Sequence, residues 1–286
     1  MMRCVAVKSV DDVHSLANQV GVISNVTLTS QATGPWMITN GNLTYHTFRN
    51  MEFRGVVLDG IDLRWAVFEN CRFTNGAGLY AVDATGAQLN GVVIDDDGTC
   101  TGDFSNAFMI SVRAGTHVNL EKANFSSALL EGCTLDETQL TGASFEGADL
   151  FSTTFAGANL VDAVFNRASL RDVRFTHANL TNVSFAFSKL DGATFKHAHT
   201  HGVRCTGAHG GPCVVELPVA GQTWQIVYSQ VDDQVHVHTD QSSYQCTLAE
   251  LDQLIDRMGG TPPLRAVATL LKTHATYTCA QQLVGA

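Results

Sequence analysis

The sequence has no apolar run long enough to form a signal peptide or a membrane span. Within the first twenty residues, Lys8, Asp11, Asp12 and His14 interrupt every apolar stretch. We therefore expect a protein with no membrane partner that stays in the cytoplasm, either of a bacterium or of a host cell if a phage encodes the chain.

Motifs for cysteine chemistry and for catalysis are missing too. The eight cysteines are scattered without a C-x-x-C pair, unlike a disulfide scaffold or a structural zinc module. There is no G-x-S-x-G, phosphate-binding loop or H-E-x-x-H. The cluster of Asp232, Asp233, His236 and His238 fits a turn and outward strand positions. The sequence thus predicts no enzyme and no cofactor.

Basic residues are scarce, since 17 Lys and Arg stand against 27 Asp and Glu for a net charge of −10. This balance disfavours direct binding to nucleic acid and favours a protein partner with a basic surface. Residues 83–162 hold twelve acids and two bases, a net charge of 2 − 12 = −10. Residues 163–205 hold six bases and two acids, or 6 − 2 = +4. The charge is therefore polarised along the chain.

What the sequence has in abundance is a period of five residues. Every fifth residue is Leu or Phe at Leu120, Phe125, Leu130, Leu135, Leu140, Phe145, Leu150, Phe155, Leu160, Phe165, Leu170, Phe175, Leu180, Phe185, Leu190 and Phe195. The residue two places before each of these is small or β-branched and never charged. Neither a helix nor a strand produces this pattern. It requires a chain that turns a corner every five residues, with both columns pointing inwards.

The stretches "GADLFSTTFAGANLVDAVF" and "HANLTNVSFAFSKL" are similar to the A(D/N)LxX consensus of the pentapeptide-repeat family. The resemblance implies an all-β fold, a right-handed quadrilateral parallel β-helix with four pentapeptides per coil. Two further runs of inward centres, Ile38–Phe73 and Leu79–Met109, are out of register by one residue. We expect the register to slip near residues 74–79 and 110–118.

Three domains are predicted. Residues 1–37 form an amino-terminal cap with two strand-like stretches and a helix that runs from a capping box at Ser9 to about Val20. Residues 38–212 form the coil. Residues 213–286 form a small α+β domain for dimerisation or partner binding, with antiparallel strands turning at Asp232–Asp233 and two helices, "TLAELDQLIDRM" and "LRAVATLLKTH".

Two clusters raise the question of a metal site. Four histidines lie around the last coil, namely His177, His197, His199 and His201. In this coil the inward centres degenerate to Thr200, Cys205 and Gly210. The side chain of His177 should lie one coil below that of His197, about 5 Å away. Outward columns of a β-helix accept any polar residue, so we favour no metal and keep these histidines only as weak candidates. The run Asp95–Asp97 lacks calcium-loop spacing, and we expect a solvated loop pushed out of the coil, at a point where the centre would be Thr99.

The acidic segment is the candidate partner-binding surface. Eighty residues make about four coils, or roughly 19 Å, over which B-DNA carries about eleven charges. One branch of the family that the chain resembles consists of dimers occupying the DNA-binding surface of type II topoisomerases, which implies a DNA mimic that binds DNA gyrase, a topoisomerase or another DNA-processing enzyme. The alternative is a phage or effector scaffold whose carboxyl-terminal domain recognises the partner. The acids concerned are Asp95, Asp96, Asp97, Asp103, Glu121, Glu131, Asp136, Glu137, Glu146, Asp149 and Asp162.

Overall fold

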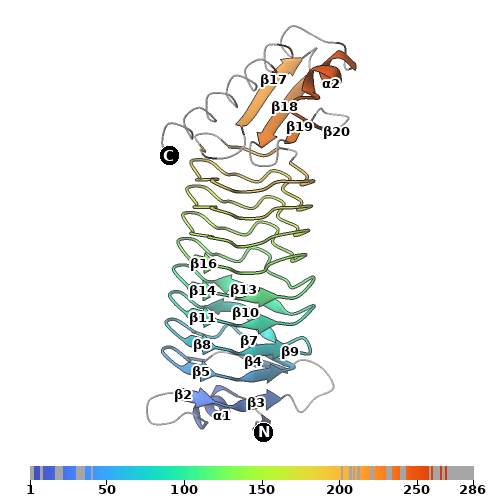
Figure 1. The fold of residues 1–286 in the computed structure, drawn as a ribbon. Helices are drawn as coiled ribbons and strands as arrows, with labels where there is room; N and C mark the ends of the chain where they lie inside the picture. The colour runs from blue at the N-terminus through green and yellow to red at the C-terminus, as the bar shows by residue number, and fades with distance from the viewer. Residues whose placement is uncertain are drawn as a thin grey trace.

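The chain forms a long parallel β-helix followed by a small antiparallel sheet (Figure 1). The computed structural model describes residues 3–6, 9–16, 22–29, 36–39, 41–200, 202–205, 208, 210, 213–219, 222–229, 234–238, 243–257, 259, 265 and 268. No helix among them is long and apolar enough to cross a membrane.

The coil has four sides. Side I is the sheet of β4 (Trp36–Thr39), β7 (Val56–Asp59), β10 (Gly78–Asp83) and β13 (Thr99–Asp103). Side II consists of the ends of β10 and β13, where Asp83 pairs with Asp103, and of single bridges such as Asp103 to Asn124. Side III is the sheet of β2 (Val22–Ser24), β5 (Thr47–Arg49), β8 (Val67–Glu69), β11 (Gln88–Asn90), β14 (Phe108–Ile110) and β16 (Leu129–Glu131). Side IV is the sheet of β1 (Arg3–Ala6), β3 (Val26–Thr29), β6 (Glu52–Arg54), β9 (Arg72–Thr74), β12 (Val93–Ile94) and β15 (Arg113–Ala114).

The ladder on side III gives the length of the coil. It runs in parallel register through nine levels, Val22, Thr47, Val67, Gln88, Phe108, Leu129, Asp149, Ser169 and Lys189. Eight steps of about 4.8 Å make a rod of roughly 40 Å. The predicted parallel β-helix is therefore confirmed.

The predicted inward columns form the core. All sixteen Leu and Phe centres from Leu120 to Phe195 are buried, and so are the small residues two places before them. Along the rod the phenylalanine rings stack on those one coil away, as Phe145 and Phe165 do with centroids 4.6 Å apart. Rings on opposite sides, II and IV, meet edge to face across the interior, as Phe145 and Phe155 do at 5.5 Å. Leu and Phe thus fill the interior because each has a fixed neighbour above, below and across the coil.

The few polar side chains in the inward column of small residues donate hydrogen bonds to nearby backbone carbonyl groups. The hydroxyl of Thr138 donates to the carbonyl of Leu135 at 2.7 Å, and that of Thr153 donates to the carbonyl of Leu130 at 2.8 Å. The Cys71 thiol donates to the carbonyl of Phe48 at 3.2 Å. Buried hydroxyls and thiols therefore cost the core little.

We expect the buried thiols to resist alkylation in the folded protein. Burial raises the pKa of Cys71 and of Cys100 to about 12, and that of Cys133 to about 11. Since the thiolate is the nucleophile, iodoacetamide at neutral pH should label these three only after unfolding in urea. Peptide mass spectrometry would locate the label, with half-buried Cys205 as the internal reference. Labelling of Cys100 in the native state would contradict the burial.

The register slips occur where the phase of the sequence changes. Phe53 pairs with Phe73 but Leu58 pairs with Leu79, which places one slip between residues 73 and 79 as predicted. The second predicted slip is the six-residue step from buried Ala114 to buried Leu120.

A third slip was not predicted. The buried centre after Ile94 is Cys100, which pairs with Leu79, and the expectation of Thr99 was wrong. Residues 95–97 were also wrongly expected to leave the coil. The amide of Asp97 donates to the carbonyl of Thr116 on the next coil, so the turn stays within the stack and only accommodates one extra residue.

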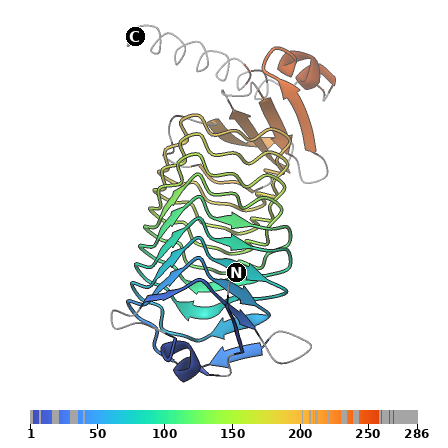
Figure 2. The same cartoon turned by 60° about the horizontal axis from the view of Figure 1, so that its bottom comes forward.

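The amino-terminal segment stacks on the first coil, since β1 pairs with β3 and β2 with β5, all in parallel. The helix α1 (Val10–His14) lies across this end of the rod (Figure 2), with Val13 buried in the core. The predicted capping box at Ser9 and Asp12 is present. The helix is shorter than predicted because the hydroxyl of Ser15 donates to the carbonyl of Asp12 at 2.7 Å, which favours a turn.

After the coil come four antiparallel strands, β17 (Cys213–Val219), β18 (Gln222–Ser229), β19 (Gln234–His238) and β20 (Ser243–Thr247), then the helix α2 (Leu251–Arg257). The predicted strands and first helix are thus confirmed. Asp232, Asp233 and most of the second predicted helix lie outside the described residues. The boundaries at 37/38 and 212/213, and the dimer or partner role of residues 213–286, stay predictions.

Candidate partner-binding surface of the coil

The predicted acids are distributed around the whole coil. Glu121 follows the centre of side I, Glu146 that of side II, Glu131 that of side III and Asp136 that of side IV. Eight of the eleven are exposed, and Asp95, Asp103 and Asp136 are half-buried. The structure therefore does not gather them into one stripe. The densest group is the corner between sides IV and I, which carries Asp95–Asp97, Asp136 and Glu137.

Few of these acids are neutralised within the coil. Among the described residues only Glu146 has an ion-pair partner within 4 Å, the Arg167 guanidinium at 3.1 Å. The first coils differ, because there Glu52, Asp62 and Glu69 each pair with an arginine. In keeping with this, the hydrogen bond from Arg64 holds the pKa of Asp62 below its ordinary value. The charge of the first coils is compensated, whereas that of the middle coils faces solvent.

Some acids hold the backbone in place. Asp96 Oδ1 accepts the amide of Thr116 at 2.8 Å, and Asp136 Oδ1 accepts the Thr154 hydroxyl and the Ala156 amide, each at 2.8 Å. The side chains of Glu121, Glu131 and Glu137 make no hydrogen bond or ion pair within the part of the chain that the structure describes. These three exposed carboxylates therefore face solvent.

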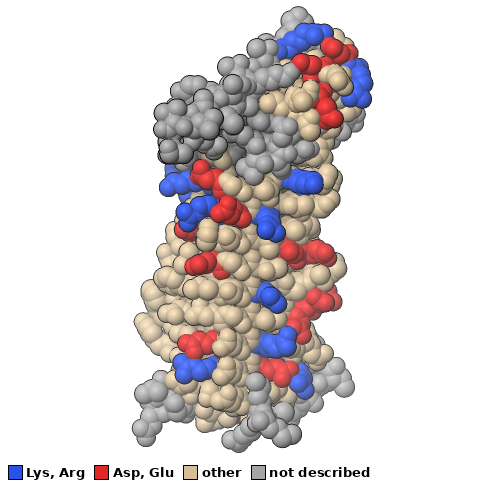
Figure 3. Space-filling view, viewed as in Figure 1, with Lys and Arg blue, Asp and Glu red and all other residues tan. Residues whose placement is uncertain are grey.

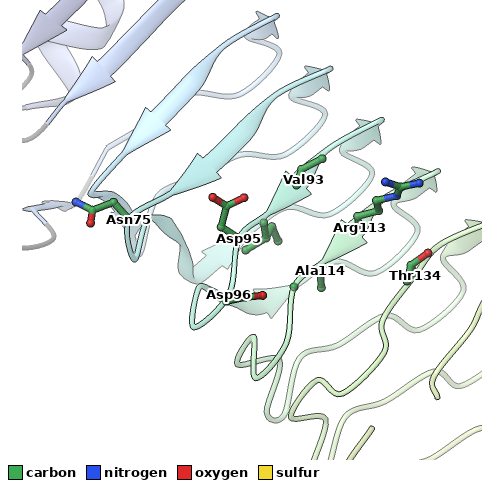
Figure 4. A pocket seen from close by; sticks show the side chains of 9 residues that line it. Asn75, Val93, Asp95, Asp96, Arg113, Ala114 and Thr134 are labelled. Atoms are coloured by element: carbon green, nitrogen blue, oxygen red, sulfur yellow. The ribbon is translucent and has the colours of Figure 1, made fainter. Parts of the chain in front are cut away.

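A hollow of about 470 Å³ opens on side IV beside the Asp95–Asp97 turn (Figure 4). It is lined by Asn75, Val93, Ile94, Asp95, Asp96, Arg113, Ala114, Gly115 and Thr134. The side chains of Asp95 and Arg113 do not point toward one another, and Asp96 is engaged by the Thr116 amide. The hollow lies where two register slips adjoin, so the acidic surface is concave there. Its lining does not bring a catalytic acid and base together.

The histidines of the last coils stack without forming a described metal site. The rings of His177 and His197 lie 4.9 Å apart and nearly parallel, as the twenty-residue spacing predicted. His199 is exposed and pairs with Asn179 on side I, whereas His201 lies outside the described residues. No group of three or more His, Cys, Asp or Glu suited to a metal occurs in the described part of the chain. Of the last predicted centres, Thr200 is buried, Cys205 is half-buried and Gly210 is exposed.

One surface feature was not predicted from the sequence. Phe108 and Ile110 of β14 flank the buried centre Met109 and expose 46% and 40% of their area. A signal was present, because both outward positions beside a centre are normally polar and here both are large and apolar.

These features together define a class of protein, a four-sided β-solenoid that displays charged and apolar side chains on a filled rod. Residues 119–155, 148–185 and 158–196 match the family model of pentapeptide repeats, in eight copies. Residues 119–196 are therefore pentapeptide repeats, and the rod that contains them is a pentapeptide-repeat β-helix. No curated protein matches the chain.

Three solved structures illustrate the likeness. HetL, a pentapeptide repeat protein involved in heterocyst differentiation regulation from the cyanobacterium Nostoc, is 21% identical over 65% of this chain and 89% of its own, with a TM-score of 0.35. A trypsin-treated form of QnrB1, a plasmid-mediated fluoroquinolone resistance protein, is 21% identical over 73% and 91%, with a TM-score of 0.32. A pentapeptide repeat protein of the Arabidopsis thaliana thylakoid lumen is 30% identical over 31% and 58%, with a TM-score of 0.25.

Proposed function

We propose that this chain is a non-enzymatic binding protein whose acidic middle segment, residues 83–162, occupies the basic DNA-binding surface of a DNA gyrase or another DNA-processing enzyme. The observation that carries the proposal is that most of these carboxylates are not neutralised by a nearby basic side chain. Of the eleven acids, ten have no ion-pair partner within 4 Å among the described residues. Uncompensated carboxylates on a rigid rod attract a basic surface and speed its association.

The density of this charge fits a surface that otherwise holds DNA. The ladder from Asp83 through Asp103, Asn124 and Ser144 to Val164 spans four steps, or about 19 Å. A net charge of −10 over that length is close to the eleven or so phosphates of duplex DNA. Since the acids lie on all four sides, the rod suits a channel or cleft that contacts it on more than one side.

We expect micromolar protein to inhibit supercoiling by purified DNA gyrase or to protect the enzyme from a quinolone. The combined substitution of Glu121→Gln, Glu131→Gln and Glu137→Gln should weaken the effect at least about tenfold, since each exposed charge contributes up to about 1 kcal/mol. The effect should also fall as salt rises. A supercoiling assay over a concentration series measures both.

The matched control removes the same charge outside the segment, with Asp59→Asn, Asp172→Asn and Asp191→Asn. This control should behave like the unchanged protein. The proposal fails if the unchanged protein neither inhibits nor protects the enzyme, or if the control loses as much activity as the glutamate variant.

A further inference from the structure

Side III carries an exposed apolar patch in the middle of the acidic segment. We define the apolar patch as Phe108 and Ile110 of β14 with Leu129 of β16. Phe108 pairs with Leu129 in the parallel ladder, so the two side chains are neighbours on consecutive coils. Ile110 lies on the same strand, two residues after Phe108, and Leu129 is half-buried. The three residues form one continuous surface.

The fold does not require apolar residues at these positions. The ladder that contains Phe108 holds Val22 and Val67 at two equivalent outward places and polar residues at five others, Thr47, Gln88, Asp149, Ser169 and Lys189. The interior is already filled by Met109 and Leu130, both buried. Apolar area left in water contributes nothing to folding, and interaction sites on proteins are commonly contiguous exposed apolar patches with a polar rim.

Two acids border the patch. Glu131 pairs with Ile110, and Asp149 pairs with Leu129 on the next coil. Neither carboxylate has an ion-pair partner among the described residues, and the nearby Arg171 guanidinium lies 4.6 Å over the ring of Phe151 instead. In Figure 3 the flank over β11 and β14 is free of charge and lies between acidic side chains at the levels of β8 and β16.

We propose that the apolar patch, with Glu131 and Asp149, docks a partner segment that presents a large apolar side chain next to a lysine or arginine. This inference rests on the proposed function. It identifies side III as the side of the rod that holds the partner in one fixed position. Uniform charge alone leaves a rod free to turn and slide, whereas a buried apolar contact fixes one position. The apolar side chain would cover Phe108 and Leu129, and the cation would meet the two carboxylates.

The same charges argue against a second copy of this chain as the occupant. Two copies joined through this patch would bring the bordering carboxylates of both molecules into one interface. Like charges in an interface cost free energy, and neither Glu131 nor Asp149 has an ion-pair partner among the described residues to offset that cost.

The test uses two labelled peptides in a Gly/Ser background. One carries Leu-Lys pairs, and the other keeps every Lys but has Ser in place of each Leu. By fluorescence anisotropy, the folded protein should bind the Leu-Lys peptide at least about tenfold more tightly than the Lys-only peptide. Phe108→Ser with Ile110→Ser should remove that preference, whereas Phe187→Ser, which alters an aromatic exposed by 56% outside the patch, should retain it.

Glu131→Gln with Asp149→Asn should weaken the binding of both peptides. Thermal unfolding of each variant would establish that the coil is intact. We expect an intact coil because the substituted side chains are exposed. The inference is overturned if the Leu-Lys peptide does not bind, if both peptides bind equally, or if the Phe108 and Ile110 variant binds unchanged. It is also overturned if light scattering shows a dimer that this variant converts to a monomer. A negative supercoiling assay with a positive peptide result would reject gyrase as the partner and keep the patch.

Discussion

Replacing Phe145 with alanine is expected to lower the free energy of unfolding by about 3–5 kcal/mol. Phe145 is fully buried, with the rings of Phe125 and Phe165 stacked at 5.0 and 4.6 Å and that of Phe155 edge-on at 5.5 Å. The alanine would leave a cavity that the closed coil cannot collapse, because all four sides are fixed by their ladders. Urea denaturation followed by circular dichroism measures the loss.

The same change at an exposed phenylalanine is the control. Phe187 exposes 56% of its area, and the Arg167 guanidinium lies 5.8 Å from its ring centroid. Phe187→Ala should therefore cost less than about 1 kcal/mol. Because each coil contacts only its neighbours, Phe145→Ala should also broaden the transition by separating the two ends of the rod. Equal losses for the two variants would show that ring stacking contributes little.

The core was predictable because it depends on two columns of the sequence. From Leu120 to Phe195 the five-residue step never varies, so a count along the chain identifies every buried centre. Where the step varies, the count fails by one residue. Thr99 and Cys100 are adjacent, and only the pairing of Cys100 with Leu79 decides between them. The six-residue step from Ile94 to Cys100 repeats the step from Phe73 to Leu79 one coil earlier, and the bulge after Leu79 in β10 then changes the register by one residue.

The candidate surface was predictable in its charge but not in its arrangement. A count of acids was enough to locate the segment. Which of these acids forms an ion pair depends on whether an arginine one coil away can reach it, as Arg167 reaches Glu146. The apolar patch was missed because a run such as Phe108–Ile110 resembles buried strand sequence. Alternation about the centre Met109 turns both neighbours outwards, which the register shows and composition does not.

Gly78→Ala is expected to destabilise the protein by about 3 kcal/mol or more, although glycine and alanine differ by one methyl group. A Cβ atom on Gly78 would lie 2.0 Å from the carbonyl oxygen of Thr99 and 2.9 Å from its amide nitrogen. Those atoms belong to β13, which pairs with β10 at this point, so the obstacle is ladder backbone and no rotamer change relieves it. Thermal and urea unfolding would measure the loss.

Gly132→Ala separates this clash from the ordinary cost of replacing a glycine. Gly132 has φ of +60° with no atom within 4 Å of its Cβ position, so alanine there should cost only about 1 kcal/mol of left-handed strain. Hydrogen exchange adds a spatial readout. In Gly78→Ala the amides of β10 and β13 should exchange faster while those beyond Leu150 keep their protection, because contacts are local to neighbouring coils. If Gly132→Ala proved as damaging as Gly78→Ala, close approach of the strands at β10 would not be what requires a glycine at position 78.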